Sequence, residues 1–211
     1  MTYEDALRAT KPGTWEGLSF ASRLEVLQTV ENHAAAETGR TPRTVKGAWL
    51  HDGPDSVELG AYDPSDNNIY VNNFQLRPDA KYGKNADDLV ETILHEGRHA
   101  YQHQVARGEV CHGDAQEAAA WAENMKPGNY VQFSQNPKAY WEQPIEADAR
   151  AHASKRLEQF RQERAALGQG ETARDVFERQ AARQGAGEGL ARHAESNGAS
   201  KLTAHHGRSQ R

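Results

Sequence analysis

The sequence predicts an α+β fold that is mostly helical, with a small antiparallel sheet beside one central helix. Long segments with apolar residues at helical spacing and one pair of short β-rich segments support this prediction. The chain has 211 residues, a formal net charge of −5 and 36% hydrophobic residues. This composition suits one folded domain with one core, and the mild negative charge gives no reason to expect nucleic acid or an anionic membrane as a partner.

The first half of the chain contains one predicted helix and one predicted hairpin. Ser19 is a suitable N-cap for a helix over Phe20–Glu37, in which apolar residues recur every three or four positions. Ser56–Asp63 and Ile69–Phe74 then flank a turn-rich segment, which is the pattern of a β-hairpin. We expect this hairpin to lie beside the central helix.

Three further helices are expected in the second half. Asn85 can cap the central helix, over Ala86–Ala106, and a second helix is expected over Asp114–Met125. A loop then leads to Pro144, which suits the first turn of a long helix ending near Leu167.

The composition changes after this last helix. Residues 168–211 are polar and rich in Gly, Ala and Arg, and Phe177 is their only aromatic residue. Such a segment cannot bury much apolar surface. We therefore expect a folded domain over 1–167 and a tail over 168–211, with at most one short helix, Glu171–Gln184.

The sequence also bears on where the protein works. It has one cysteine, Cys111, no apolar run of membrane-spanning length and no N-terminal apolar stretch typical of a secretory signal. The expected location is the cytoplasm, or the exterior after export without a cleaved signal.

The central helix contains the pattern H-E-x-x-H at His95, Glu96 and His99. Residues four apart lie on one face of a helix, so both imidazoles can reach one Zn²⁺ ion. The glutamate beside the first histidine can then take a proton from a water that the metal polarises. The alternative is an ordinary solvated polar face.

A helical wheel separates the two sides of this helix. Its apolar stripe comprises Ala86, Leu89, Val90, Ile93, Leu94, Gly97, Ala100 and Tyr101. His95 and His99 lie on the opposite side, with Glu96 toward one edge. The helix therefore either exposes its polar side or forms the floor of a cleft, and a third ligand from elsewhere would decide between them.

The last long helix offers that third ligand. Glu146 falls within its apolar stripe, where a carboxylate is costly unless it is paired or bound to a metal, whereas Asp148 points nearly the other way. Glu142 is a weaker alternative, because it precedes Pro144 and its backbone is not expected to be helical. The competing interpretation of Glu146 is a salt bridge to an arginine such as Arg23 or Arg98.

Other candidates fit less well. A third histidine of the metzincin kind is disfavoured, since the position six residues after His99 is Val105. His103 is one turn beyond His99 and could itself join the metal, although a position beside the metal ligands or in solvent is expected instead. Cys111 and His112 are adjacent but lack a second cysteine. The strand Ile69–Phe74 could be an edge strand that binds an extended peptide, or a plain core strand.

From Trp15 to Phe160 the chain resembles a zincin metallopeptidase with a glutamate third ligand, broadly similar to thermolysin. The stretches that carry the likeness include "GAYDPSDNNIYVNN", "LVETILHEGRHAYQHQ" and "YWEQPIEADARAHA". Their order resembles small bacterial metallopeptidase domains of polymorphic toxins and mobile elements. The resemblance implies Zn²⁺ ligands at His95, His99 and Glu146, with Glu96 as general base.

One position departs from that pattern. Thermolysin-type enzymes place an aspartate four residues after the ligand glutamate to orient a histidine, and here that position is Arg150. Asp148 or Asp88 could orient the histidine instead.

The expected function is hydrolysis of peptide bonds in a peptide or protein substrate. A donor to the developing oxyanion is also expected, with Tyr140, His103 and His152 as candidates. One alternative is a toxin or effector protease for a single host protein, with a possible immunity or inhibitor protein as partner. Another is a non-catalytic binding or structural module stabilised by metal.

Overall fold

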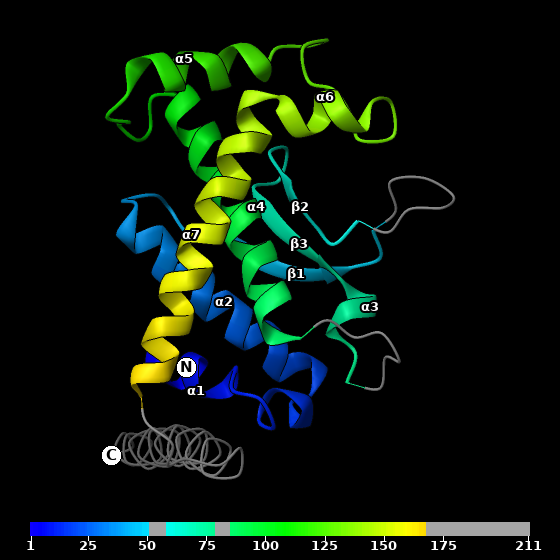
Figure 1. The fold of residues 1–211 in the computed structure, drawn as a ribbon, viewed down its shortest axis with the longest axis vertical. Helices are drawn as coiled ribbons and strands as arrows, with labels where there is room; N and C mark the ends of the chain where they lie inside the picture. The colour runs from blue at the N-terminus through cyan, green and yellow to red at the C-terminus, as the bar shows by residue number, and fades with distance from the viewer. Residues whose placement is uncertain (51–57, 79–84, 168–211) are drawn as a thin grey trace, which may run out of the picture. The chain divides into compact units, whose positions relative to one another are not determined.

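The computed structural model describes residues 1–50, 58–78 and 85–167 (Figure 1). They form an α+β fold of many helices and one small mixed sheet, which confirms the predicted fold class. The predicted tail over 168–211, with its short helix, lies outside the described residues. Within the described ranges, every helix is too short or too polar to cross a membrane.

The strands lie between the second and third α-helices in the order of the chain. The elements are α1 (Tyr3–Ala9), the 3₁₀ turn η1 (Trp15–Gly17), α2 (Phe20–Glu37), β1 (Thr44–Ala48), β2 (Gly60–Asp63), β3 (Asn68–Asn72), α3 (Asn73–Leu76), α4 (Ala86–Ala106), α5 (Ala115–Asn124), α6 (Pro137–Glu142) and α7 (Pro144–Ala166).

The predicted long helices are confirmed, and their caps explain where they begin. The Ser19 side chain accepts a hydrogen bond from Ser22 N at the start of α2. Asn85 accepts one from Asp88 N at the start of α4. These side chains satisfy amide groups that the first helical turn leaves without a partner.

Several short elements were not predicted. The expected loop before Pro144 contains α6, which Asn136 caps and Pro137 begins. Because of α6, Glu142 is helical, and the expectation that its backbone is not helical was wrong. The helices α1 and α3 and the strand β1 are too short to show a clear apolar period.

The sheet has the strand order β1-β3-β2. The predicted hairpin is confirmed in β2 and β3, which pair antiparallel, although Ser56 and Val57 of the predicted first strand lie outside the described residues. Strand β1 pairs parallel to the other side of β3. The sheet is therefore mixed and not antiparallel. Of the two interpretations of Ile69–Phe74, the structure supports the core strand, because β3 is central and β2 is the edge strand beside α4.

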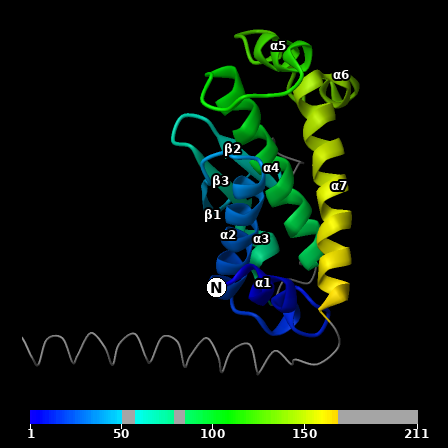
Figure 2. The same cartoon turned by 90° about the vertical axis from the view of Figure 1, so that its left-hand side faces the viewer.

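Helix α4 lies at the centre of the fold, between α7 on one side and the sheet with α2 on the other (Figure 2). The apolar stripe predicted for α4 is buried along its whole length. Gly97 lies in this stripe, where a Cβ atom would come within 2.5 Å of Arg40 Nη2 and 2.9 Å of Glu31 Oε2. This buried Arg40–Glu31 ion pair lies directly under the H-E-x-x-H turn, against Gly97.

Candidate metal centre

Helices α4 and α7 bring the three predicted ligands together. The Nε2 atoms of His95 and His99 are 3.1 Å apart. His95 Nε2 lies 3.3 Å from Glu146 Oε2, and His99 Nε2 lies 3.3 Å from Glu146 Oε1. One ligand atom from each residue therefore converges on one point, from two helices that are distant in sequence.

Glu146 reaches this point because of its place on α7. It lies on the apolar face of the helix and is 1% exposed, as the sequence predicted. Asp148 points away and pairs with Arg98, with Arg98 Nε 2.7 Å from Asp148 Oδ2. Glu142 lies on the surface, 3.9 Å from Lys138. Of the three carboxylates weighed as ligands, only Glu146 lies beside both histidines.

The three residues fit a zinc ion by geometry and by chemistry. In a tetrahedral site with bond lengths of about 2.0–2.2 Å, neighbouring ligand atoms are about 3.3 Å apart, close to the separations seen here. Glu146 Oε2 is also buried without a hydrogen-bond partner among the described residues. Two imidazoles and one carboxylate are the donor set of catalytic zinc sites that keep one position open.

A fully buried glutamine orients His99. Gln102 Nε2 donates to Ile145 O at 2.9 Å and to Asp148 Oδ2 at 2.6 Å, so its amide nitrogen faces α7. Its Oε1 atom then faces His99 Nδ1 at 2.9 Å and accepts a hydrogen bond from it. With the proton on Nδ1, the lone pair of His99 Nε2 points toward the metal position.

The residue that contacts the histidine therefore differs from the two predicted for it. Asp148 takes part only through Gln102, and Asp88 belongs to the cavity wall. Gln102 is three residues after His99, and side chains at this spacing are neighbours on one face of a helix. This spacing is the feature of the sequence from which the contact could have been predicted. Glu146 forms a salt bridge with neither of the two arginines considered for it, because Arg98 pairs with Asp148 and Arg23 binds main-chain carbonyl groups. A third arginine does pair with it: Arg150 Nη1 lies 4.0 Å from Glu146 Oε2.

Burial and charge set the protonation of the cluster. Burial lowers the pKa of His99, but the hydrogen bond to Glu146 and the charges of Glu96 and Glu146 raise it to about 9. Burial raises the pKa of Glu146, yet its contacts with His95 and His99 outweigh this and hold the pKa well below the ordinary value. Glu146 is therefore an anion at neutral pH, whereas His99 is a cation in the absence of a metal and would release its Nε2 proton when a metal binds.

The side chain of Glu96 extends from α4 to the edge strand β2. Its Oε2 atom accepts a hydrogen bond of 2.8 Å from Tyr62 N on β2, and the residue is 8% exposed. The strand approaches this closely because residue 60 is glycine: a Cβ there would clash with Thr92 Cγ2 and lie 3.3 Å from Glu96 Cγ. The carboxylate is thus held in one place beside the histidines.

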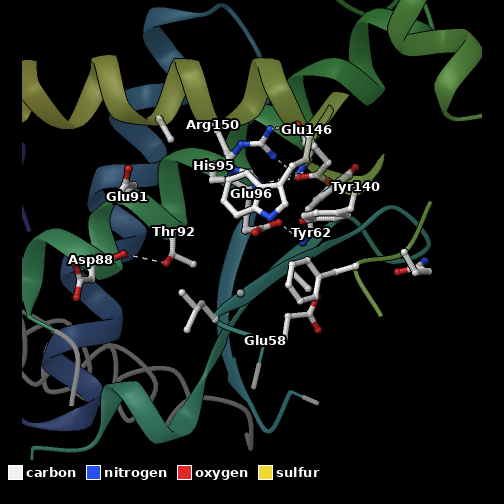
Figure 3. A pocket seen from close by; sticks show the side chains of 18 of the residues that line it. Glu58, Tyr62, Asp88, Glu91, Thr92, His95, Glu96, Tyr140, Glu146 and Arg150 are labelled. Carbon is white, nitrogen blue, oxygen red and sulfur yellow. Dashed lines mark hydrogen bonds and ion pairs between the residues drawn. The ribbon is translucent and has the colours of Figure 1, made fainter. Parts of the chain in front are cut away.

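A cavity of about 670 Å³ opens over the cluster (Figure 3). Strand β2 and helix α4 form one side of it, and α7, α6 and the segment before α6 form the other. Its lining includes His95, Glu96, His99 and Glu146 together with aromatic residues from outside α4. These aromatic residues are Tyr62, Tyr130, Phe133, Tyr140 and Trp141. The polar side of α4 is therefore the floor of a cleft.

Two tyrosines face Glu146 from this lining. Tyr130 Oη donates a hydrogen bond of 2.8 Å to Glu146 Oε1. Burial and the charge of Glu146 raise the pKa values of Tyr130 and Tyr140 above the ordinary range, so both hydroxyl groups keep their protons at neutral pH. Tyr130 was not predicted, because its loop has no pattern that reveals a contact with α7.

The other oxyanion candidates and spare histidines lie elsewhere. Neither His103 nor His152 belongs to the lining of the cavity. His103 packs against the Tyr62 ring, with ring centroids 5.3 Å apart. His112 is hydrogen-bonded to Tyr101 Oη and Glu117 Oε2, while Cys111 is exposed. The Cys111–His112 pair therefore has no part in the metal cluster.

Comparisons of this chain with models of known protein families, with curated proteins and with solved structures find no match. The site is accordingly interpreted from its own geometry.

Proposed function

We propose that the protein is a zinc-dependent metallopeptidase. The observation that carries this proposal is the convergence of His95, His99 and Glu146 on the floor of a cleft, with the Glu96 carboxylate beside them. A purely structural zinc site is usually closed by four protein ligands. Here the cluster supplies three ligands and faces a cavity large enough for a segment of peptide.

The chemistry needs a Lewis acid and a base. A bound zinc ion would polarise a water molecule and the carbonyl group of the substrate. Glu96 takes the proton of the attacking water and passes it to the amine nitrogen when the C–N bond breaks. The hydrogen bond from Tyr62 N fixes the position of this carboxylate without removing its capacity to accept a proton.

Strand β2 is a suitable platform for an extended substrate. Asn72 N donates to Leu59 O at 3.1 Å, which makes Leu59–Asn72 a hydrogen-bonded pair of the antiparallel ladder. The next pair, Gly60–Val71, then directs the main-chain groups of Gly60 away from β3 and toward the cleft. A peptide that adds to this edge would lie across the metal position.

The test uses the zinc-loaded protein and a library of quenched fluorescent peptides. We expect cleavage by the wild type, and a loss of at least about 1000-fold in kcat/KM in Glu96→Gln with one zinc ion per chain retained. Glu117→Gln is the matched control, since Glu117 is a partly exposed glutamate of α5 outside the cavity. Zinc binding without cleavage of any peptide by the wild type would favour the non-catalytic alternative.

A further inference from the structure

Arg150 lies one turn after Glu146 on α7 and reaches into the same cavity. In Figure 3 its guanidinium points toward Glu146. The guanidinium carbon lies 4.1 Å from the centroid of the Trp141 ring, and Nη2 donates a hydrogen bond to the Trp141 carbonyl oxygen. These two contacts hold the planar group in one orientation.

One side of this guanidinium has no hydrogen-bond acceptor. Nη1 is buried, and in the part of the chain that the structure describes it has no hydrogen-bond partner. Its nearest charged neighbour is Glu146 Oε2 at 4.0 Å, which is too far for a hydrogen bond. A buried donor left without a partner destabilises a protein, so its presence needs an explanation, and a role in binding or catalysis is one.

The neighbouring donors are already directed to other groups. Tyr130 Oη donates to Glu146, and Tyr140 also interacts with this carboxylate. Tyr62 N donates to Glu96. Arg150 Nη1 is thus a buried donor beside the cluster that remains available for an oxygen atom of a bound molecule.

We propose that Arg150 is a catalytic residue whose Nη1–H donates to the carbonyl oxygen of the scissile peptide bond; this rests on the proposed function. When the oxygen of water bonds to the carbonyl carbon, the π electrons move to the carbonyl oxygen, which becomes negative. Arg150 stabilises that charge and keeps its own protons, because a guanidinium does not titrate at neutral pH. The proton of the water passes through Glu96 to the leaving amine.

The competing role for Arg150 is to offset the charge of Glu146. Two probes separate the roles by calorimetry on the full-length, zinc-loaded protein: a dipeptide phosphinate and a dipeptide thiol of the same side chains. The tetrahedral phosphorus carries two oxygens, one for the metal and one at the place of the carbonyl oxygen. The thiol offers a single sulfur to the metal and has no oxygen at the place of the scissile carbonyl oxygen, where Arg150 would donate.

In Arg150→Met we expect the affinity for the phosphinate to fall by about 100-fold, which is the effect of removing one oxyanion donor, while the affinity for the thiol is unchanged. Arg150→Lys should restore only part of the loss, since lysine lacks the fixed planar geometry. Arg161→Met is the matched control on the same helix, because Arg161 pairs with Asp87 outside the cavity.

Three results would overturn the assignment. An equal loss of affinity for both probes, or a loss of zinc in Arg150→Met, would make Arg150 a counter-ion of Glu146. Unchanged binding of the phosphinate would remove any contact with the carbonyl oxygen. If the wild type binds zinc but neither probe and cleaves no peptide, the proposed function itself fails, and the role of Arg150 fails with it.

Discussion

The two halves of the candidate metal centre are built in different ways. The half on α4 consists of His95, Glu96 and His99, whose relative positions follow from the geometry of a single helix. The half on α7 consists of Glu146, which reaches the histidines only because α4 and α7 pack together. The first half is encoded locally, whereas the second depends on the packing of the whole domain.

The contacts that hold the two halves in place, which we call their supports, differ in the same way. The buried Arg40–Glu31 ion pair lies under α4 at Gly97, on the side away from the cavity. Helix α7 is connected to His99 through Gln102 and Asp148, next to the metal position. A change in the first support should therefore alter mainly the stability of the protein, and a change in the second should alter mainly metal binding.

The largest expected effect is loss of zinc when either half loses a ligand. His99→Ala and Glu146→Ala should each weaken zinc binding on the order of 1000-fold or more, because only two protein ligands remain. Metal analysis after dialysis measures this, with Glu142→Ala as the matched control on α6. Retention of zinc in Glu146→Ala together with its loss in Glu142→Ala would reverse the choice of third ligand.

The next effect concerns the support under α4. In Gly97→Ala the added methyl group clashes with the Arg40–Glu31 pair. We expect the free energy of unfolding to fall by about 2 kcal/mol, because this clash outweighs the better helix propensity of alanine. Urea denaturation of the zinc-free protein measures this. Gly113→Ala is the control, since a Cβ at Gly113 meets nothing within 4 Å. Equal stabilities for the two variants would contradict the proposed role of Gly97.

The support beside α7 gives a contrasting prediction. Gln102→Leu removes the acceptor that orients His99, so zinc affinity should fall by about 10–100-fold. Gln104→Leu is a matched control: Gln104 is also a fully buried glutamine of α4, but its side chain binds Thr41 N and Thr41 O and does not contact the metal cluster. Competition with a zinc chelator should separate the variants, and equal affinities would refute the orienting role.

The smallest expected effect lies where α7 meets the start of α4. Burial raises the pKa of Asp87, but the hydrogen bonds from Arg164 and Arg161 outweigh it and lower the pKa below its ordinary value. Asp87 therefore contributes stability above the pKa of the unfolded state, near pH 4, and loses it as the pH falls through the folded-state pKa.

The corresponding variant is Asp87→Asn. It should be about 1 kcal/mol less stable than the wild type at pH 7, and this difference should disappear toward about pH 2. Chemical denaturation across this pH range provides the measurement. A stability difference between wild type and variant that grows toward low pH would mean that folding raises the pKa of Asp87 and does not lower it.

The same contrast explains what could be predicted from the sequence. The face of α4 and the burial of Glu146 follow from helical periodicity, which a single chain displays directly. Tyr130 and Arg150 could not be assigned, because their positions depend on how a loop and α6 pack over α7. Gln102 is a polar residue of α4, yet it is fully buried, because its side chain binds Ile145 O and Asp148 on α7. The parallel strand β1 was missed because its pairing is with a distant segment.

Gly60 shows how a residue without a functional group can govern the chemistry of this cleft. Any side chain at this position would move β2 away from α4, and with it the amide of Tyr62 that holds Glu96. The width of the cleft beside β2 and the position of the Glu96 carboxylate are therefore set together. A single substitution at Gly60 would disturb both while leaving His95, His99 and Glu146 unchanged in the sequence.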